Sequence, residues 1–481
     1  MASLIPAPCD ESRSIEAGQS PCISPTGTLV ATVLGSSLAF VMGSIINVAL
    51  PAMREDFETD AAGVQWMVNA YLLPLSALVL VGGSLGDHYG RKRCFMAGLA
   101  IFMIATLACA LSPTLEVLFA ARFLQGVGAA LLAPNSLAII ADGFHGEERG
   151  KAVGTWAAAG AVAGAVAPLM AGLVIDVLDW RWAFAIVVPP GAVAWLVAKQ
   201  SVRESRADAV ERSGLDVAGA VLATLTLTLL TFALIGLPTR GLTDPQTVLF
   251  GCVFMGSLAL FLLVEHRKKA SAMLPLGAFG SRAFIGISLL TLLLYAAIGG
   301  LMILLPYVLI EANDYSATQA GASLLPFPLV IAALSRSLGG LAARIGTATS
   351  LIIGSLAVAL GFGALGLLTS QKVDYWTQVL PPLIVIAIGM SFCVSPLTTA
   401  VMDAVEDRFV GVASGINNAT SRIAGLVATA LLGFVLIDES GSSEVLVAGA
   451  TTASFVGAAL ALASAACAWL MIAEARASTG S

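Results

Sequence analysis

Long apolar runs recur along the whole chain, and each is long enough to cross a lipid bilayer as a helix. A helix of roughly 20 residues spans the ~30 Å hydrocarbon core, and inside lipid it satisfies its own backbone hydrogen bonds. The sequence therefore predicts an all-α polytopic membrane protein. Its fourteen predicted transmembrane helices cover residues 28–50, 63–84, 94–112, 115–138, 151–176, 182–199, 214–236, 246–264, 283–309, 318–337, 347–368, 379–400, 410–437 and 446–472.

The composition agrees with a membrane-spanning chain and argues against a nucleic-acid partner. Hydrophobic residues make up 58% of the 481 residues and charged residues only 11%, whereas soluble domains carry about 25% charged residues. The net charge is −6, and no block of Lys and Arg resembles a nucleic-acid-binding arm. The lipid bilayer is therefore an expected partner, and nucleic acid is not.

The positions of the basic residues predict how the chain sits in the membrane. With both termini in the cytoplasm, most of the 24 Lys and Arg residues lie in cytoplasmic loops and tails. Only Arg54, Arg181, Arg240 and Lys372 lie in the loops on the other side. Cytoplasmic loops of membrane proteins carry an excess of Lys and Arg, so we expect both termini to be cytoplasmic.

A charged segment in the first half of the chain returns in the second half. The short turn Gly83–Arg93 lies between two apolar runs and reappears in reduced form as Gly339–Gly346. Ala343 stands in the second copy where the first has Asp87. Two related halves in one chain are a known transporter architecture, with parallel repeats around a central site.

A second repeated segment indicates how many helices each half contains. Glu148–Gly150 returns as Asp407–Arg408 followed by Gly411. The first six predicted helices therefore correspond to the last six. The predicted fold is thus two parallel six-helix halves plus a central helix pair. The predicted divisions are a mobile cytoplasmic tail at 1–27, an N-terminal half at 28–200, the inserted helix pair with its loops at 201–282, a C-terminal half at 283–473 and a cytoplasmic tail at 474–481.

Several motifs resemble those of one transporter family. Gly83–Arg93 fits a G-x-L-x-D-x-x-G-R-K pattern, and Leu118–Gly128 contains an R-x-x-Q-G pattern that begins at Arg122. With Trp180–Phe184 and Asn47–Pro51, they make the chain resemble the major facilitator superfamily, and more narrowly its fourteen-helix drug:proton antiporter branch. The resemblance implies a fourteen-helix bundle that exports small, amphipathic, toxic compounds by alternating access and proton antiport.

The segment Gly83–Arg93 is the first candidate site. Asp87 and Arg91, with Asp142 of a neighbouring helix, place an acid, a base and an acid at one end of the predicted bundle. Charge-assisted hydrogen bonds are strong, and the resemblance implies that such a network holds the inner gate closed. The alternative is that the basic residues only set the topology. The gating candidates are Gly83, Asp87, Gly90, Arg91, Lys92 and Asp142.

Two arginines lie inside predicted spans, whereas every acidic residue lies in a tail, a loop or the last turn of a helix. A guanidinium in a membrane helix costs about 2.5 to 3.5 kcal/mol, so Arg122 and Arg422 are expected to face the bundle interior. The alternative is a structural tie between helices, and a buried Asn also commonly joins two helices. The candidates for the substrate and proton pathway are Arg122, Gln125, Asn47, Asn69, Asn417, Asn418 and Arg422.

Small residues at spacings of four follow one face of the predicted helix 151–176. They are Gly160, Gly164, Pro168 and Gly172. Such a stripe permits close helix contact, which suits a surface that rocks against the other half, although ordinary tight packing is the alternative. The family motif is incomplete here, because Ala163, Ala167 and Ala171 replace its glycines.

The charges of the predicted spans bear on the substrate. Family members that export cations commonly carry an acid where this chain has Met42, and no acid is expected near the bilayer centre. We therefore expect a neutral or positive cavity that prefers neutral or anionic compounds. Asp87, Asp142, Asp176 and Glu311 remain the candidates for proton coupling.

The expected function is secondary active export, coupled to protons, by a chain that is not an enzyme. No phosphate-binding G-x-x-x-x-G-K-[ST] loop for ATP occurs, and the three histidines have no metal-ligand spacing, so we expect no cofactor and no metal. A uniporter or a differently coupled metabolite exporter is the alternative, and a non-transporting receptor or scaffold of the same fold is a third. We expect a monomer in a bacterial inner membrane, with a small-molecule substrate and H⁺ as partners.

Overall fold

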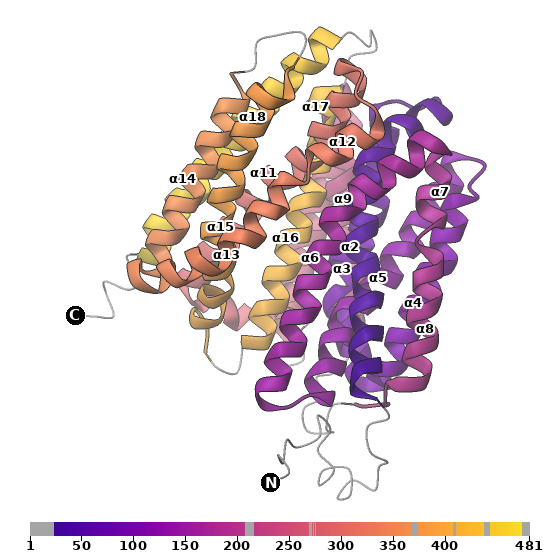
Figure 1. The fold of residues 1–481 in the computed structure, drawn as a ribbon. Helices are drawn as coiled ribbons and strands as arrows, with labels where there is room; N and C mark the ends of the chain where they lie inside the picture. The colour runs from indigo at the N-terminus through magenta and orange to yellow at the C-terminus, as the bar shows by residue number, and fades with distance from the viewer. Residues whose placement is uncertain are drawn as a thin grey trace, which may run out of the picture.

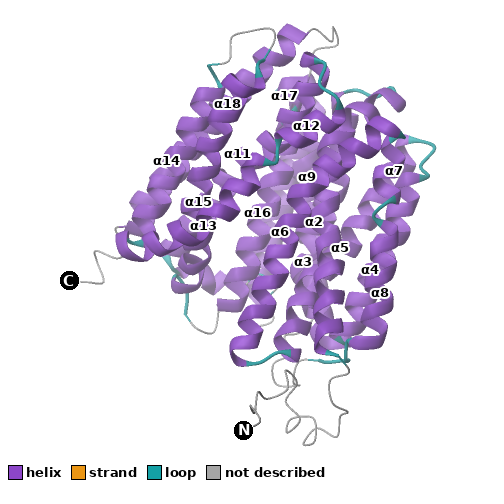
Figure 2. Cartoon of the chain, viewed as in Figure 1, coloured by secondary structure: helices purple, strands orange, loops and turns teal. Residues whose placement is uncertain are grey.

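The secondary structure of the described residues is helical. The computed structural model describes residues 24–206, 216–268, 272, 274, 276–367, 373–406, 410–436 and 443–473. Helices and short loops make up these ranges, with no strand among them (Figure 2). Fourteen spans in the described chain are long and apolar enough to cross a membrane. The predicted fold class and the predicted number of helices are therefore confirmed.

The first six spans form one group of helices, coloured indigo to magenta in Figure 1. They are α2 (Pro25–Asp56), α3 (Ala61–Tyr89), α4 (Arg91–Ala110), α5 (Leu115–Gly143), α6 (Gly146–Val177) and the pair α7 (Trp180–Ala185) and α8 (Val188–Ser201). The last span breaks before α8, whose first turn contains Pro189 and Pro190; proline suits a first turn because its missing N–H needs no partner there. α2 packs against α5, α6 and α8, and α5 also packs against α3 and α4.

The last six spans form a second group, on the other side of the bundle in Figure 1. They are α11 (Arg282–Asn313), α12 (Ala317–Ser323) with α13 (Pro326–Ile345), α14 (Thr347–Leu365), η3 (Tyr375–Val379) with α15 (Leu380–Asp403), α16 (Val410–Leu431) with α17 (Gly433–Leu436), and α18 (Ser443–Cys467) with η5 (Ala468–Ala473). α14 packs against α15 and α18, and α11 packs against α16 and α18. Within the described residues, the buried apolar side chains of this group are continuous with those of the first group.

The two middle spans lie where the groups meet. They are α9 (Val217–Arg240) and α10 (Pro245–Lys268), and the short 3-10 turn η2 (Leu276–Gly280) leads from them to α11. α9 and α10 pack against each other, and α9 also contacts α3 of the first group and α16 of the second. α3 and α16 are themselves in contact, so α9 covers that seam and α10 packs against α9.

The turn expected at Gly83–Arg93 is much shorter in the structure. α3 continues as a helix to Tyr89, and α4 begins at Arg91, so Gly90 alone separates the two helices. Gly90 has φ +116°, a backbone conformation that glycine adopts readily and other residues rarely do. The short turn expected here is thus reduced to a single residue, because polar residues at a membrane surface can continue a helix until such a residue ends it.

The second copy of this segment has the same local structure. α13 runs to Ile345 and α14 begins at Thr347, with Gly346 between them at φ +93°. The equivalence of Gly90 and Gly346 supports the repeat that the sequence indicates. Of the other repeated segment, Asp407–Arg408 lies outside the described residues.

The first helix begins earlier than expected. α2 starts at Pro25, after Ser24, whose Oγ accepts the backbone N–H of Gly27 at 3.1 Å. A serine cap followed by proline in the first turn is a strong helix start. The last three residues of the predicted N-terminal tail 1–27 therefore belong to α2. Residues 1–23 and the predicted tail 474–481 lie outside the described residues.

Candidate functional site

Arg91 joins three helices at the end of the bundle that carries Gly83–Arg93, named here the motif end. Its Nε and Nη2 donate to Oδ1 of Asp87 at 3.1 and 3.0 Å, and its Nη1 lies 3.4 Å from Oδ1 of Asp142. The structure thus brings together the acid, base and acid of the predicted network, from α3, α4 and α5. Because the two carboxylates are 41% and 45% exposed, each pair is expected to add only about 0–1 kcal/mol to stability.

Glu204, which no sequence motif marks, holds the start of α4. Its Oε1 accepts the backbone N–H of Lys92 at 3.1 Å, and its Oε2 lies 3.5 Å from Nε of Arg93. A Cβ at Gly90 would displace the Glu204 carboxylate, so a substitution there would disturb this bond in addition to straining φ. Nζ of Lys92 donates instead to the carbonyl of Lys199 at 2.9 Å, at the end of α8, where a helix dipole favours a cation.

The close approach of α3 to α5 occurs beside Gly83 rather than at it. A Cβ at Gly83 would meet only Cβ of Pro134, at 3.4 Å, which is an ordinary contact. A Cβ at Gly82 or Gly86 would instead overlap α5, at the carbonyl of Ala130 or the side chain of Asn135. Among these glycines, Gly82 and Gly86 are therefore the ones that close packing requires.

Arg122 is fully buried and bonded within the first group of helices. Its Nε donates to the carbonyl of Met67 at 3.0 Å, and its Nη1 donates to Oε1 of Gln125 at 2.6 Å. Gln125 in turn donates to Oγ1 of Thr106 at 2.7 Å, and the guanidinium carbon lies 4.6 Å from the ring centre of Tyr71. These contacts join α3, α4 and α5 and support the structural alternative for Arg122.

Replacing Arg122 by methionine is expected to lower the stability of the protein. The change removes the hydrogen bonds that Arg122 donates to the Met67 carbonyl and to the Gln125 side chain, both of which are buried. Each buried polar group left without a partner lowers the free energy of unfolding by about 1–3 kcal/mol. The thermal unfolding midpoint in detergent should therefore fall by several degrees. Arg422→Met removes no hydrogen bond within the described residues and is the matched control; an equal fall in both variants would contradict the structural role.

The predicted polar residues divide between helix joints and an exposed face. Oδ1 of Asn417 accepts the hydroxyl of Thr291 at 2.8 Å and so ties α16 to α11. Asn47 is buried on α2, and Asn69 on α3 is 0% exposed, with neither amide atom of Asn69 hydrogen-bonded within the described residues. Asn418 is exposed. Asn418 therefore differs from the other predicted asparagines in that its side chain is not packed between helices.

Arg422 reaches from the second group of helices to the first. It lies on α16, half-buried, and its guanidinium carbon is 6.0 Å from the ring centre of Phe40 on α2. Its Nε is buried and has no hydrogen-bond partner among the described residues. Arg422 and Arg122 look alike in the sequence, but their surroundings differ.

The small-residue stripe of α6 divides between two partners. A Cβ at Gly160 would lie 3.1 Å from the ring of Phe40, and a Cβ at Gly164 would lie 3.6 Å from Phe40 Cβ, so this part packs on α2. Further along, a Cβ at Gly172 would overlap the carbonyl of Ala317 on α12, and a Cβ at Gly321 would overlap the carbonyl of Pro168. The second part of the stripe therefore joins the two groups of helices.

A carboxylate strengthens the same joint. Asp176, near the end of α6, accepts the backbone N–H groups of Ala317 and Thr318 at 3.0 and 2.9 Å, at the start of α12. At the end of α2, Nη1 of Arg54 donates to the hydroxyl of Tyr307 on α11 at 2.6 Å. We name this end of the bundle the opposite end. Both contacts link the first group to the second.

Towards the motif end, one face of α6 is left uncovered. A Cβ added at Gly146, Gly150 or Gly154 would meet no atom within 4 Å. On the other side, α13 buries only Phe327 and Ala342. The contact between α6 and the broken helix α12–α13 is therefore concentrated at the opposite end.

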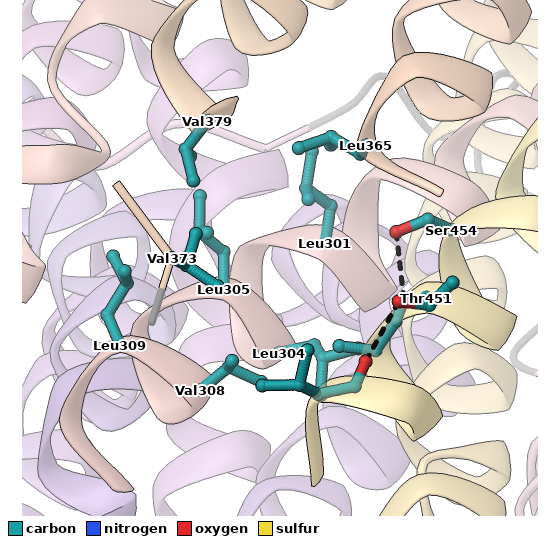
Figure 3. Close-up of a pocket in the computed structure, with 12 residues that line it drawn as sticks. Leu301, Leu304, Leu305, Val308, Leu309, Leu365, Val373, Val379, Thr451 and Ser454 are labelled. Carbon is teal, nitrogen blue, oxygen red and sulfur yellow. Dashed lines mark hydrogen bonds between the residues drawn. The ribbon is translucent and has the colours of Figure 1, made fainter. Parts of the chain in front are cut away.

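A small apolar cavity lies inside the second group, away from these charged residues. It has a volume of about 50 Å³ and is lined by Leu301, Leu304, Leu305, Val308, Leu309, Leu365, Val373, Val379, Val447, Ala450, Thr451 and Ser454 (Figure 3). The hydroxyls of Thr451 and Ser454 bond to carbonyls of their own helix. Sites for drug-sized ligands measure about 300–1,000 Å³, so this cavity is too small to be one.

The described residues offer no metal site. No group of three or more His, Cys, Asp or Glu side chains within those ranges is placed to hold a metal ion.

Known proteins are similar to this chain along most of its length. The family model described as Major Facilitator Superfamily matches residues 32–429. The Multidrug resistance protein Stp of Mycobacterium tuberculosis (strain CDC 1551 / Oshkosh) is 31% identical over 410 residues, which cover 85% of this chain and 75% of that protein. The Methylenomycin A resistance protein of Bacillus subtilis (strain 168) is 32% identical over 421 residues, which cover 86% of this chain and 88% of that protein.

Solved structures share the fold at low sequence identity. One, from work on substrate recognition in proton dependent oligopeptide transporters, has a TM-score of 0.69 at 15% identity and covers 94% of this chain and 100% of that chain. Another is a bacterial homolog to the human lysosomal transporter Spinster, in an inward-facing and occupied conformation. It has a TM-score of 0.66 at 17% identity and covers 92% of this chain and 96% of that chain.

Proposed function

The chain belongs to the Major Facilitator Superfamily, and from that premise we propose that it exports small molecules by alternating access coupled to protons. It is a multi-pass membrane transporter whose relatives include multidrug resistance and drug efflux proteins. Those relatives are bacterial, which supports a bacterial inner membrane. The excess of basic residues in alternate loops supports cytoplasmic termini, and the transporter acts as a monomer.

The uneven contact between α6 and α12–α13 is the observation that carries this proposal. The two groups meet closely at the opposite end, through Gly172 and Asp176, while the glycine face of α6 is uncovered in its motif-end half. A transporter that works by alternating access must close one end while the other is open. The moving bodies are residues 28–200 and 283–473, and the inserted pair 201–282 rests against the seam of α3 and α16.

The gates at the two ends differ in their chemistry. At the opposite end, protonation of Asp176 removes a negative charge from the start of α12 and weakens the joint. At the motif end, Asp87 and Asp142 share Arg91, and closure brings Asp87 to the start of a helix of the other group. Protons thus act on carboxylates at the helix ends, with Glu311 as a further candidate, rather than on an acid at the bilayer centre.

The central residues favour neutral or anionic substrates. Arg122 and Arg422 bring positive charge to the middle of the bundle, and Met42 occupies the position where cation exporters of the family carry an acid. A guanidinium repels a cationic ligand and attracts an anionic one. The substrate pathway is formed by Arg422 and Asn418, with Arg122, Gln125, Asn47, Asn69 and Asn417 behind them.

Flux measurements in proteoliposomes test this function. We expect neutral and anionic amphipathic compounds to move faster when a pH gradient is imposed, because protons drive the exchange. A permanent dication should not move above the protein-free background. Equal flux with and without the gradient would favour a uniporter, and no flux of any compound would favour a receptor or scaffold of the same fold.

A further inference from the structure

We propose that Arg422 is the residue that recognises an anionic group of the substrate, and that the site takes aromatic compounds which carry a carboxylate or similar group. This inference rests on the proposed export function, because it places the substrate between the two groups of helices. It assigns different roles to the two arginines. Arg122 positions helices, and Arg422 binds the ligand.

The hydrogen bonds of the two guanidiniums separate these roles. Arg122 uses Nε and Nη1 on the carbonyl of Met67 and the side chain of Gln125. Arg422 makes no hydrogen bond or ion pair within the described residues, and its Nε is buried. A guanidinium has five N–H donors in a planar fork, and a buried charge is costly unless it is paired. Arg122 keeps only its buried Nη2 without a partner among the described residues, whereas the whole guanidinium of Arg422 is available to a ligand.

The surroundings of Arg422 favour a flat aromatic partner. The guanidinium carbon lies 6.0 Å from the ring centre of Phe40 on α2. Phe40 in turn lies edge to face with Trp156 on α6, with ring centres 6.4 Å apart, and Nε1 of Trp156 is held by the hydroxyl of Ser136 at 3.1 Å. Aromatic pairs of this kind offer both a face and an edge for a third ring.

Open space adjoins these side chains on both helices. Gly43 lies one turn from Phe40 on α2, and a Cβ added there would meet no atom within 4 Å. Asn418 lies one turn from Arg422 on α16 and is exposed. A compound that occupies this space can stack on Phe40 and give its anionic group to Arg422. Guanidinium binds carboxylate in a bidentate way with good geometry.

A pair of probes that differ in charge and share one ring system tests the proposal. Isothermal titration calorimetry on the full-length protein in lipid nanodiscs would compare 2-naphthoate with 2-naphthamide. We expect the wild type to bind the acid about tenfold more tightly, as a charged hydrogen bond predicts. Arg422→Gln should remove this preference and leave the affinity for the amide unchanged, and Arg422→Lys should keep part of it.

Two further variants serve as controls. Arg149→Gln removes the same charge from an exposed position on α6 and should keep the preference for the acid. Phe40→Leu should lower the affinity for the acid and the affinity for the amide equally, by about threefold or more, since aromatic contacts contribute about 0.5–1.5 kcal/mol. The proposal is wrong if the wild type shows no preference, or if Arg422→Gln retains it.

Failure of the site and failure of the exporter function give different results. A preference that depends on Arg422, without flux of either compound in proteoliposomes, would leave the anion site intact and contradict export. Normal gradient-driven flux, with a preference that does not depend on Arg422, would contradict the site and leave export intact.

Discussion

Replacing Gly172 by leucine is expected to slow transport severely, because closing the opposite end of the bundle then costs additional free energy. A Cβ at Gly172 would overlap the carbonyl oxygen of Ala317, and this backbone cannot move aside unless α12 moves with it. Overpacking at a tight contact costs about 1–3 kcal/mol. A penalty of about 1.4 kcal/mol on the closed state alone shifts the equilibrium tenfold, so we expect flux in proteoliposomes to fall at least about tenfold.

A glycine outside the two moving groups provides the control for this prediction. A Cβ at Gly251 on α10 would meet no atom within 4 Å, so Gly251→Leu should transport at close to the wild-type rate. A single cysteine in place of Ala171, which is 1% exposed, reports the conformation. It should react with a membrane-impermeant maleimide from the opposite end faster when Gly172 is replaced by leucine than when Gly172 is kept. Normal flux or unchanged labelling in the leucine variant would mean that this contact does not act as a gate.

The spans were predictable from the sequence because their signal is local. Length and hydropathy identify a membrane helix without any knowledge of its neighbours, and all fourteen runs correspond to helical spans. The breaks inside spans were not predictable in this way. α12 ends at Ser323 and α13 begins at Pro326 within a continuous apolar run. The length of the turn at Gly90 was overestimated. The polar residues around it are part of the helices, and α3 ends only where Gly90 adopts a positive φ.

The candidate site was predictable where its partners are close in the chain. Asp87 and Arg91 are one helical turn apart in sequence and bond directly. Glu204 and the bonding of Asp176 to α12 were missed, because each depends on segments that only the tertiary fold brings together. No local pattern contains that information.

The two membrane arginines illustrate the same limit. Both lie in apolar runs, and hydropathy assigns each the same insertion cost. Only the fold distinguishes them, since Arg122 meets a backbone carbonyl and Gln125 whereas Arg422 meets the ring of Phe40. Sequence reasoning therefore identified both as candidates but had no means of dividing their roles.

Replacing Asp87 by asparagine is expected to stop transport while the protein still inserts and folds. In the wild type, Arg91 donates two hydrogen bonds to a single oxygen of Asp87. An asparagine side chain keeps one oxygen that can accept both bonds, so α3 and α4 should stay joined. The change removes the negative charge that would face the start of a helix when the motif end closes. Such a charge at a helix N-terminus contributes up to about 2 kcal/mol, enough for a tenfold change in population.

The control for this variant is an acid at the same end that has no part in the network. In the wild type, Oε1 of Glu147 lies 2.9 Å from Nζ of Lys151 in an exposed ion pair. Glu147→Gln removes this ion pair and should keep normal flux. Asp87→Asn should match the wild type in its thermal unfolding midpoint, yet transport at least about tenfold more slowly. If Asp87→Asn transports normally, the charges of this segment serve only to set the topology. If Asp87→Asn transports slowly and its thermal unfolding midpoint is also lower than that of the wild type, Asp87 stabilises the packing of the helices rather than the closed gate.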